Sequence, residues 1–91
     1  MGVEIRLSGS LVARAGARRA TVPVHDEATV SDVVRELADR YGPQVEPAIL
    51  ESEGRFRTDT RAIRELPGPS ERLGPNSRVR SGDTVRFEIA E

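Results

Sequence analysis

The sequence contains no cysteine and no lysine, and each absence excludes a class of chemistry. Without cysteine the chain can form no disulfide, offers no thiolate to a metal ion and has no thiol nucleophile. Without lysine it has no side-chain amine that could be acylated or form a Schiff base. Covalent catalysis through a thiol or a side-chain amine is therefore excluded, and all 14 basic residues are arginines.

Aromatic residues, net charge and long apolar runs are also scarce. Aromatic residues make up 3% of the chain. The net charge is -1, so the chain has no strong positive field that would attract nucleic acid or an anionic membrane. The sequence has no long apolar run, so we expect neither a signal peptide nor a membrane span. We therefore expect a cytoplasmic protein with no nucleic-acid or membrane partner. Its 91 residues suit one domain, residues 1–91, with a single core.

The clearest predicted element is a helix over residues 29–42, TVSDVVRELADRYG. Its apolar residues recur with helical spacing and form one stripe: Val30, Val33, Val34, Leu37, Ala38 and Tyr41. Thr29 followed by Asp32 predicts an N-terminal cap, because the threonine hydroxyl can accept an N–H of the first turn. Gly42 can adopt the left-handed conformation that closes a helix, and Pro43 cannot continue it. The stripe must be buried against a sheet or other helices.

Four strands are predicted around this helix. Alternating apolar residues predict strands over residues 3–7, 20–24 and 85–89, and a weaker pattern predicts one over residues 58–66. Pro23 lacks a ladder N–H, so the second strand is expected at a sheet edge. This order favours an α+β fold of the β-grasp, or ubiquitin-like, type. Its mixed sheet of about four strands packs on one main helix and has the first and last strands paired at its centre. A different small α+β sandwich is the alternative.

The connections between these elements are expected to be irregular. Residues 8–19 are small, polar and basic, which indicates a loop anchored on the core by Leu11 and Val12. Residues 43–50 contain two prolines, which leave room for one short helical turn. Residues 70–80 are predicted to be irregular chain, with Leu73 and Val79 as inward anchors.

Four segments of the sequence match a known family in their order and spacing. They are LVARAGARRATVPV, DEATVSDVVRELADRYG, ILESEGRFR and SGDTVRFEIA. Together they resemble the sulfur-carrier (MoaD/ThiS-like) family, which includes the small subunit of molybdopterin synthase and the thiamine-pathway sulfur carrier. The resemblance covers nearly the whole chain. It implies a ubiquitin-like fold and a protein partner, such as an activating or sulfur-accepting enzyme.

The resemblance also implies where the chemistry of the family takes place. In such carriers a flexible tail ending in Gly-Gly enters the ATP site of a partner, where its terminal carboxylate is adenylated and converted to a thiocarboxylate. When Gly82 and Asp83 are aligned with the family's Gly-Asp turn, this sequence ends, as FEIAE, before such a tail would begin. Glu88 also stands where the family has an exposed apolar residue that contacts the partner. We therefore expect no thiocarboxylate chemistry from the chain as written.

Two further groups of residues are of types that can form a binding site. His25 is the only histidine, and a metal site would need more ligands at fixed spacing, so a solvated loop histidine is expected. A run of arginines flanks Phe56: Arg55, Arg57, Arg61 and Arg64. Basic and aromatic residues together can bind single-stranded nucleic acid, but one aromatic residue and a net charge of -1 do not favour this. A salt-bridged strand face is the expected structure, with an acidic protein partner as the alternative.

The function that these observations favour is docking to a protein partner. We expect a non-catalytic accessory or interaction module, not an enzyme, with no catalytic, cofactor-binding or metal-binding residues. One alternative is a genuine sulfur carrier of the molybdopterin or thiamine type whose diglycine is missing from this chain or generated otherwise. Another is a ubiquitin-like module of a different system. The expected docking surface is the exposed sheet face around the last strand and the arginine run: Phe56, Arg57, Arg61, Arg64, Arg86, Glu88 and Glu91.

Overall fold

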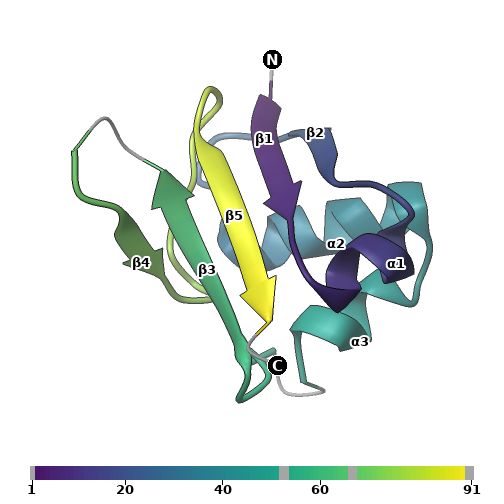
Figure 1. The fold of residues 1–91 in the computed structure, drawn as a ribbon. Coiled ribbons are helices and arrows are strands. Elements are labelled where there is room, and N and C mark those ends of the chain that lie inside the picture. The colour runs from purple at the N-terminus through teal and green to yellow at the C-terminus, as the bar shows by residue number, and fades with distance from the viewer. Residues whose placement is uncertain (1, 52–53, 66–67, 90–91) are drawn as a thin grey trace.

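The computed structural model describes residues 2–51, 54–65 and 68–89. In these residues one face of a sheet is covered by the main helix, and the other face, toward the viewer in Figure 1, carries no helix. The elements in chain order are β1 (Gly2–Leu7), α1 (Ser10–Ala15), β2 (Arg19–Pro23), α2 (Val30–Tyr41), α3 (Val45–Ile49), β3 (Thr60–Glu65), β4 (Glu71–Leu73) and β5 (Thr84–Ile89).

The sheet has five strands in the order β2-β1-β5-β3-β4. β1 and β5 run parallel at its centre, and the other neighbouring strands are antiparallel. This arrangement confirms the predicted β-grasp fold, the central pairing of the first and last strands and the edge position of the strand that contains Pro23. The predicted number of strands is one too low. The missed strand is β4, whose three residues include a single inward anchor, Leu73, and therefore show no alternation.

Helix α2 begins and ends where its sequence indicates. The Thr29 hydroxyl accepts from the backbone N–H of Asp32 at 3.3 Å, and the Asp32 carboxylate accepts from the N–H of Thr29 at 3.0 Å. This reciprocal capping box satisfies two N–H groups of the first turn. Gly42 ends the helix with φ 121° and ψ 151°, an extended positive-φ conformation instead of the predicted left-handed helical one. That region is essentially restricted to glycine.

The connection between β1 and β2 differs from its prediction as a loop. Residues Ser10–Ala15 form helix α1, which Gly16 closes with φ 76° and ψ 15°. Six residues are too few for a helix to be stable by propensity alone. Leu11 is 1% exposed, so burial of this side chain against the core stabilises the short helix.

The core lies between the sheet and α2. Alternate residues of the two central strands point into it, and Ile5, Val85 and Phe87 are completely buried there. Leu37 of α2 is buried against them, as its place in the apolar stripe predicts. Because side chains alternate along a strand, the intervening residues of the central strands, and the corresponding residues of the other strands, point away from the helix. They form an exposed surface that we call the outer sheet face.

Candidate functional site

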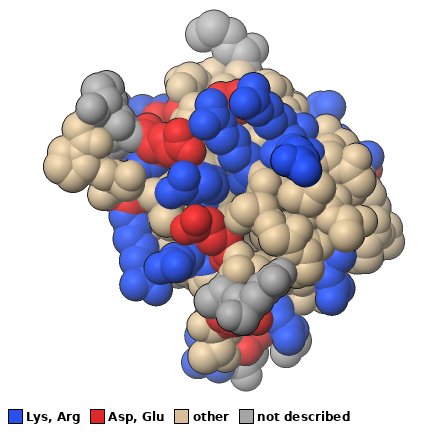
Figure 2. Space-filling view, in the orientation of Figure 1, with Lys and Arg blue, Asp and Glu red and all other residues tan. Residues whose placement is uncertain are grey.

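The outer sheet face carries more charged than uncharged side chains. Among the strand residues that the structure describes, its charged members are Glu4, Arg6, Arg19, Arg61, Glu65, Arg72, Arg86 and Glu88. Figure 2 has the orientation of Figure 1 and shows basic and acidic side chains intermixed over this surface. The five arginines and three glutamates give this face a net charge of +2, whereas the whole chain has -1.

Glu65 of β3 is the central acidic group of this face. One of its carboxylate oxygens lies 3.3 Å from Nη1 of Arg6, and the other lies 3.7 Å from Nη1 of Arg86. These two arginines belong to the central strands β1 and β5 and are in register. One carboxylate therefore contacts two guanidinium groups on two different strands.

A second carboxylate extends the network toward the other end of β5. Oε1 of Glu88 lies 3.4 Å from Nε of Arg61, and its Oε2 lies 3.6 Å from Nε of Arg86. Glu4 lies 4.0 Å from Arg6 and accepts a hydrogen bond from the Thr84 hydroxyl at 3.3 Å. The ion pairs thus form a continuous network of alternating charge across three strands. Such a network holds long side chains in fixed positions better than isolated surface pairs do.

Three members of the predicted docking surface lie together in this network: Arg61, Arg86 and Glu88. Phe56 lies elsewhere, because it pairs with Leu50 in an isolated bridge and packs against the core. Arg57 is exposed beside it and donates to the carbonyl oxygen of Pro47. Glu91 lies outside the described residues, as does Leu66 at the end of the predicted third strand.

Arg64 points to the opposite, helix-facing side of the sheet. Its side chain is 22% exposed and lies 3.1 Å from the carboxylate of Glu71 and 3.6 Å from that of Asp83. It also donates to the carbonyl oxygen of Arg78. Arg64 therefore joins β4, the segment after it and the turn before β5. This position gives it a structural role and separates it from the outer sheet face.

Some residues of the outer sheet face were not predicted as site residues: Glu4, Arg6, Arg19, Glu65 and Arg72. The alternation of Glu4 and Arg6 with apolar residues indicates only that they point outward. Their proximity to Glu65 depends on strand pairing between residues far apart in the chain. Sequence patterns alone do not reveal that register.

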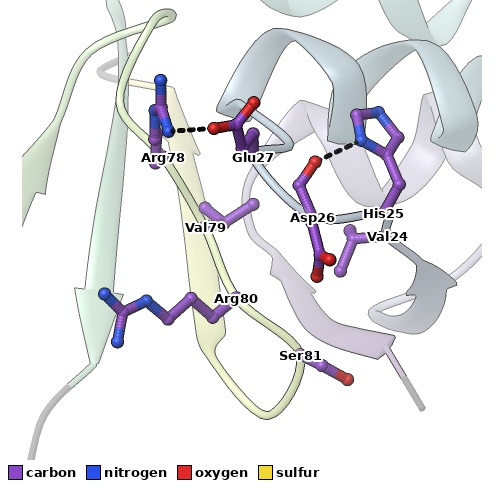
Figure 3. Close-up of a pocket in the computed structure, with 8 residues that line it drawn as sticks. All are labelled: Val24, His25, Asp26, Glu27, Arg78, Val79, Arg80 and Ser81. Atoms are coloured by element: carbon purple, nitrogen blue, oxygen red, sulfur yellow. Dashed lines mark hydrogen bonds and ion pairs between the residues drawn. The ribbon is translucent and has the colours of Figure 1, made fainter.

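The cleft around His25 is lined by polar and charged residues together with two valines, Val24 and Val79. It has a volume of about 470 Å³ and lies between residues 24–27 and 78–81 (Figure 3). Nδ1 of His25 lies 2.7 Å from the carbonyl oxygen of Asp26. Glu27 forms an ion pair with Arg78, with its Oε1 atom 3.3 Å from Nη1. The His25 side chain is 72% exposed, which confirms the predicted solvated histidine. In the described residues no group of three or more potential ligands could hold a metal ion.

The ionisable group of the capping box, Asp32, has a perturbed acidity. The hydrogen bond from the Thr29 backbone N–H holds the pKa of Asp32 below its ordinary value of 3.8. Burial opposes this shift, and the Thr29 hydroxyl, His25 and Arg35 add to it. The perturbation arises from helix capping.

Among the helices of the described residues, none has the length and apolar character that a membrane-spanning helix requires. No protein-family model matches the chain, and no curated protein matches its sequence. Solved structures do match. SAMP1 from Haloferax volcanii has a TM-score of 0.79 at 24% identity, with 100% of this chain and 97% of that chain covered. A crystal structure of small archaeal modifier protein 1 from H. volcanii gives 0.78 at 24% identity, covering 93% and 92%.

A molybdopterin converting factor, subunit 1, from Pyrococcus furiosus is also similar. It has a TM-score of 0.76 at 13% identity, and the match covers 100% of this chain and 99% of that chain. At such identities the similarity establishes the fold. The chain therefore has the ubiquitin-like β-grasp fold of MoaD/ThiS-like proteins, and the resemblance seen in its sequence is confirmed at the level of fold.

Proposed function

We propose that this protein is a non-catalytic docking module that binds a protein partner through its outer sheet face. The observation that carries the proposal is the ion-pair network of Arg6, Glu65, Arg86, Glu88 and Arg61, on a sheet face that no helix of the described residues covers. The fold adds support, because the similar structures include a small modifier and a subunit of a converting factor. The partner class that fits is an activating or sulfur-accepting enzyme.

Recognition by such a face depends on matched charge. Guanidinium and carboxylate groups that are held in place present fixed donors and acceptors to a partner surface. Their pattern steers association and penalises partners with the wrong charge arrangement more than it adds affinity. Binding should therefore weaken as salt is added, because screening acts most strongly on exposed charges.

Site-specific cross-linking in the cells that make this protein tests the proposal. Ile63 is suitable for a photoreactive amino acid, because it lies on the outer sheet face and carries no charge of the network. Asp39 on the exposed side of α2 is the matched control. We expect residue 63 to cross-link to a discrete partner protein and residue 39 to give no such product. Cross-linking of the same partner from residue 39 alone would overturn the assignment of the surface.

A second candidate function is that of a sulfur carrier or a small modifier, which the similarity to SAMP1 and to the converting-factor subunit favours. In that case the C-terminal carboxylate of the mature protein carries sulfur or is joined to another protein. Intact-mass spectrometry of the protein from its own cells distinguishes the two functions. A thiocarboxylate or a covalent conjugate supports the carrier or modifier, and an unmodified carboxylate supports docking alone.

A further inference from the structure

Arginines from four different strands lie in one row across the outer sheet face. Arg6 of β1 is in register with Arg19 of β2 on one side and with Arg86 of β5 on the other. Ile63 of β3 continues the row, since it is in register with Arg86 and with Arg72 of β4. All five side chains point to the same side of the sheet. With strands about 4.8 Å apart, the row spans about 19 Å from Arg19 to Arg72.

The two ends of this row differ from its centre. Arg6 and Arg86 share the carboxylate of Glu65, and their side chains are 40% and 39% exposed. Arg19 and Arg72 are exposed at the two edge strands, and neither forms an ion pair within the described residues. A guanidinium has five N–H donors, so the central arginines also keep donors beyond those that face Glu65.

Like charges directly opposite each other on neighbouring strands are destabilising. The glutamates of the face compensate for this repulsion only in part, because its net charge remains +2. A ligand with carboxylates spaced along the row would supply the missing counter-charge. Arginine binds planar carboxylates, as it binds phosphates, through paired N–H···O bonds.

We propose that the arginine row binds an acidic peptide segment of the partner, laid across the strands. The inference rests on the proposed docking function and specifies the chemistry of the partner. An extended segment rises about 3.3 Å per residue, so about six residues span the row. Carboxylates near its ends reach Arg19 and Arg72. An apolar side chain between the acidic ones meets Ile63, the uncharged member of the row.

The surroundings of the row favour an acidic peptide over nucleic acid. Glu4 and Glu65 lie on one side of the row, so a wider polyanion meets negative charge there, and on the other side Glu88 is paired with Arg61, so that side adds no net positive charge. The row itself offers no aromatic ring on which a base could stack, and stacking is a main source of affinity for single strands. A narrow peptide chain avoids both problems.

Fluorescence anisotropy with the full chain at low ionic strength tests the inference. The probe is a labelled Glu-Glu-Glu-Leu-Glu-Glu peptide, and its control is the same peptide with Gln in place of Glu. We expect the acidic peptide to bind saturably and the Gln control peptide not to bind. The double variant Arg19→Glu/Arg72→Glu should raise its Kd at least about tenfold, since it reverses both end contacts.

The control variant is Arg14→Glu/Arg80→Glu, which changes the net charge equally at two exposed arginines outside the row. We expect its Kd to stay within about threefold of the wild-type value, because only the general field changes. Equal loss in both variants, or no binding of the acidic peptide, overturns the inference. Tighter binding of a single-stranded oligonucleotide of equal charge also overturns it. If residue 63 still cross-links to a partner in any of these cases, the docking function stands and only the acidic segment is wrong.

Discussion

Arg6 and Arg86 lie directly opposite each other on the parallel central strands, and the carboxylate of Glu65 contacts both. Two like charges in register would destabilise the pairing of β1 with β5 on their own. The counter-charge that the two arginines share comes from β3, a strand that neighbours β5 but not β1. The charge pattern of the outer sheet face is therefore a property of three strands together.

Removing this shared carboxylate should destabilise the fold modestly. Glu65→Gln leaves the two arginines facing each other without their common partner. We expect the free energy of unfolding to fall by about 0.2–1 kcal/mol at low salt, the range for exposed pairs. Because salt screens exposed charges, the loss should shrink as ionic strength rises. Urea melts at two salt concentrations measure this, with Asp39→Asn on the exposed side of α2 as the control. A loss that does not depend on salt would contradict the electrostatic account.

Leu37 is the residue of α2 whose truncation should be most damaging. It is 0% exposed and lies in the middle of the apolar stripe. Leu37→Ala removes buried methyl groups and leaves a cavity, so we expect a loss of about 2–5 kcal/mol in the free energy of unfolding. Urea denaturation followed by circular dichroism provides the value. A loss below about 1 kcal/mol would mean that the helix does not pack on the sheet as described.

Thr29 should contribute through its cap. Its hydroxyl accepts from the N–H of Asp32, and the Asp32 carboxylate accepts in return. Thr29→Ala removes one half of this box and should cost about 1 kcal/mol of stability. Thr58→Ala, at an exposed turn, is the matched control. If Thr29→Ala and Thr58→Ala lower the Tm by the same amount, the cap does not stabilise α2.

The same cap predicts how stability depends on pH. The pKa of Asp32 lies below its ordinary value of 3.8 in the folded protein, chiefly because the Thr29 N–H donates to the carboxylate. A lowered folded-state pKa stabilises the fold at pH above the unfolded-state pKa, and this contribution is lost as the pH falls through the folded-state pKa. We therefore expect the stability difference between the wild type and Asp32→Ala to be constant near neutral pH and to shrink below about pH 4. A difference that grows on acidification would contradict this assignment.

The main features of the fold could be predicted because they depend on short-range patterns. The stripe that includes Leu37 and the cap at Thr29 define α2, and strict alternation defines β1 and β5. Helix α1 was missed because burial of Leu11 stabilises it, and that burial depends on the packed core. β4 was missed because three residues are too few to show a period.

The candidate site was predictable only in part, for a related reason. Arg86 and Glu88 alternate with buried residues on β5, so their outward direction follows from the sequence. The register that places Glu65 beside Arg6 joins positions 59 residues apart, and no local pattern encodes it. Arg64 was expected on the exposed docking surface, and this prediction is wrong. The alternation in its strand is unclear, and its side chain points to the helix-facing side of the sheet.

A charge exchange on the outer sheet face tests the central claim most directly. Glu88→Arg alone places three like charges together. Arg61→Glu/Glu88→Arg keeps an opposite-charge pair at these two positions with its direction reversed, and it gives up the contact of residue 88 with Arg86, which keeps its contact with Glu65. The measurement is the Kd for the cross-linked partner, with Tm as the check on folding. We predict that the double exchange leaves Tm near the wild-type value and raises the Kd at least about tenfold. An unchanged Kd with an unchanged Tm would contradict the assignment of this face as the docking surface.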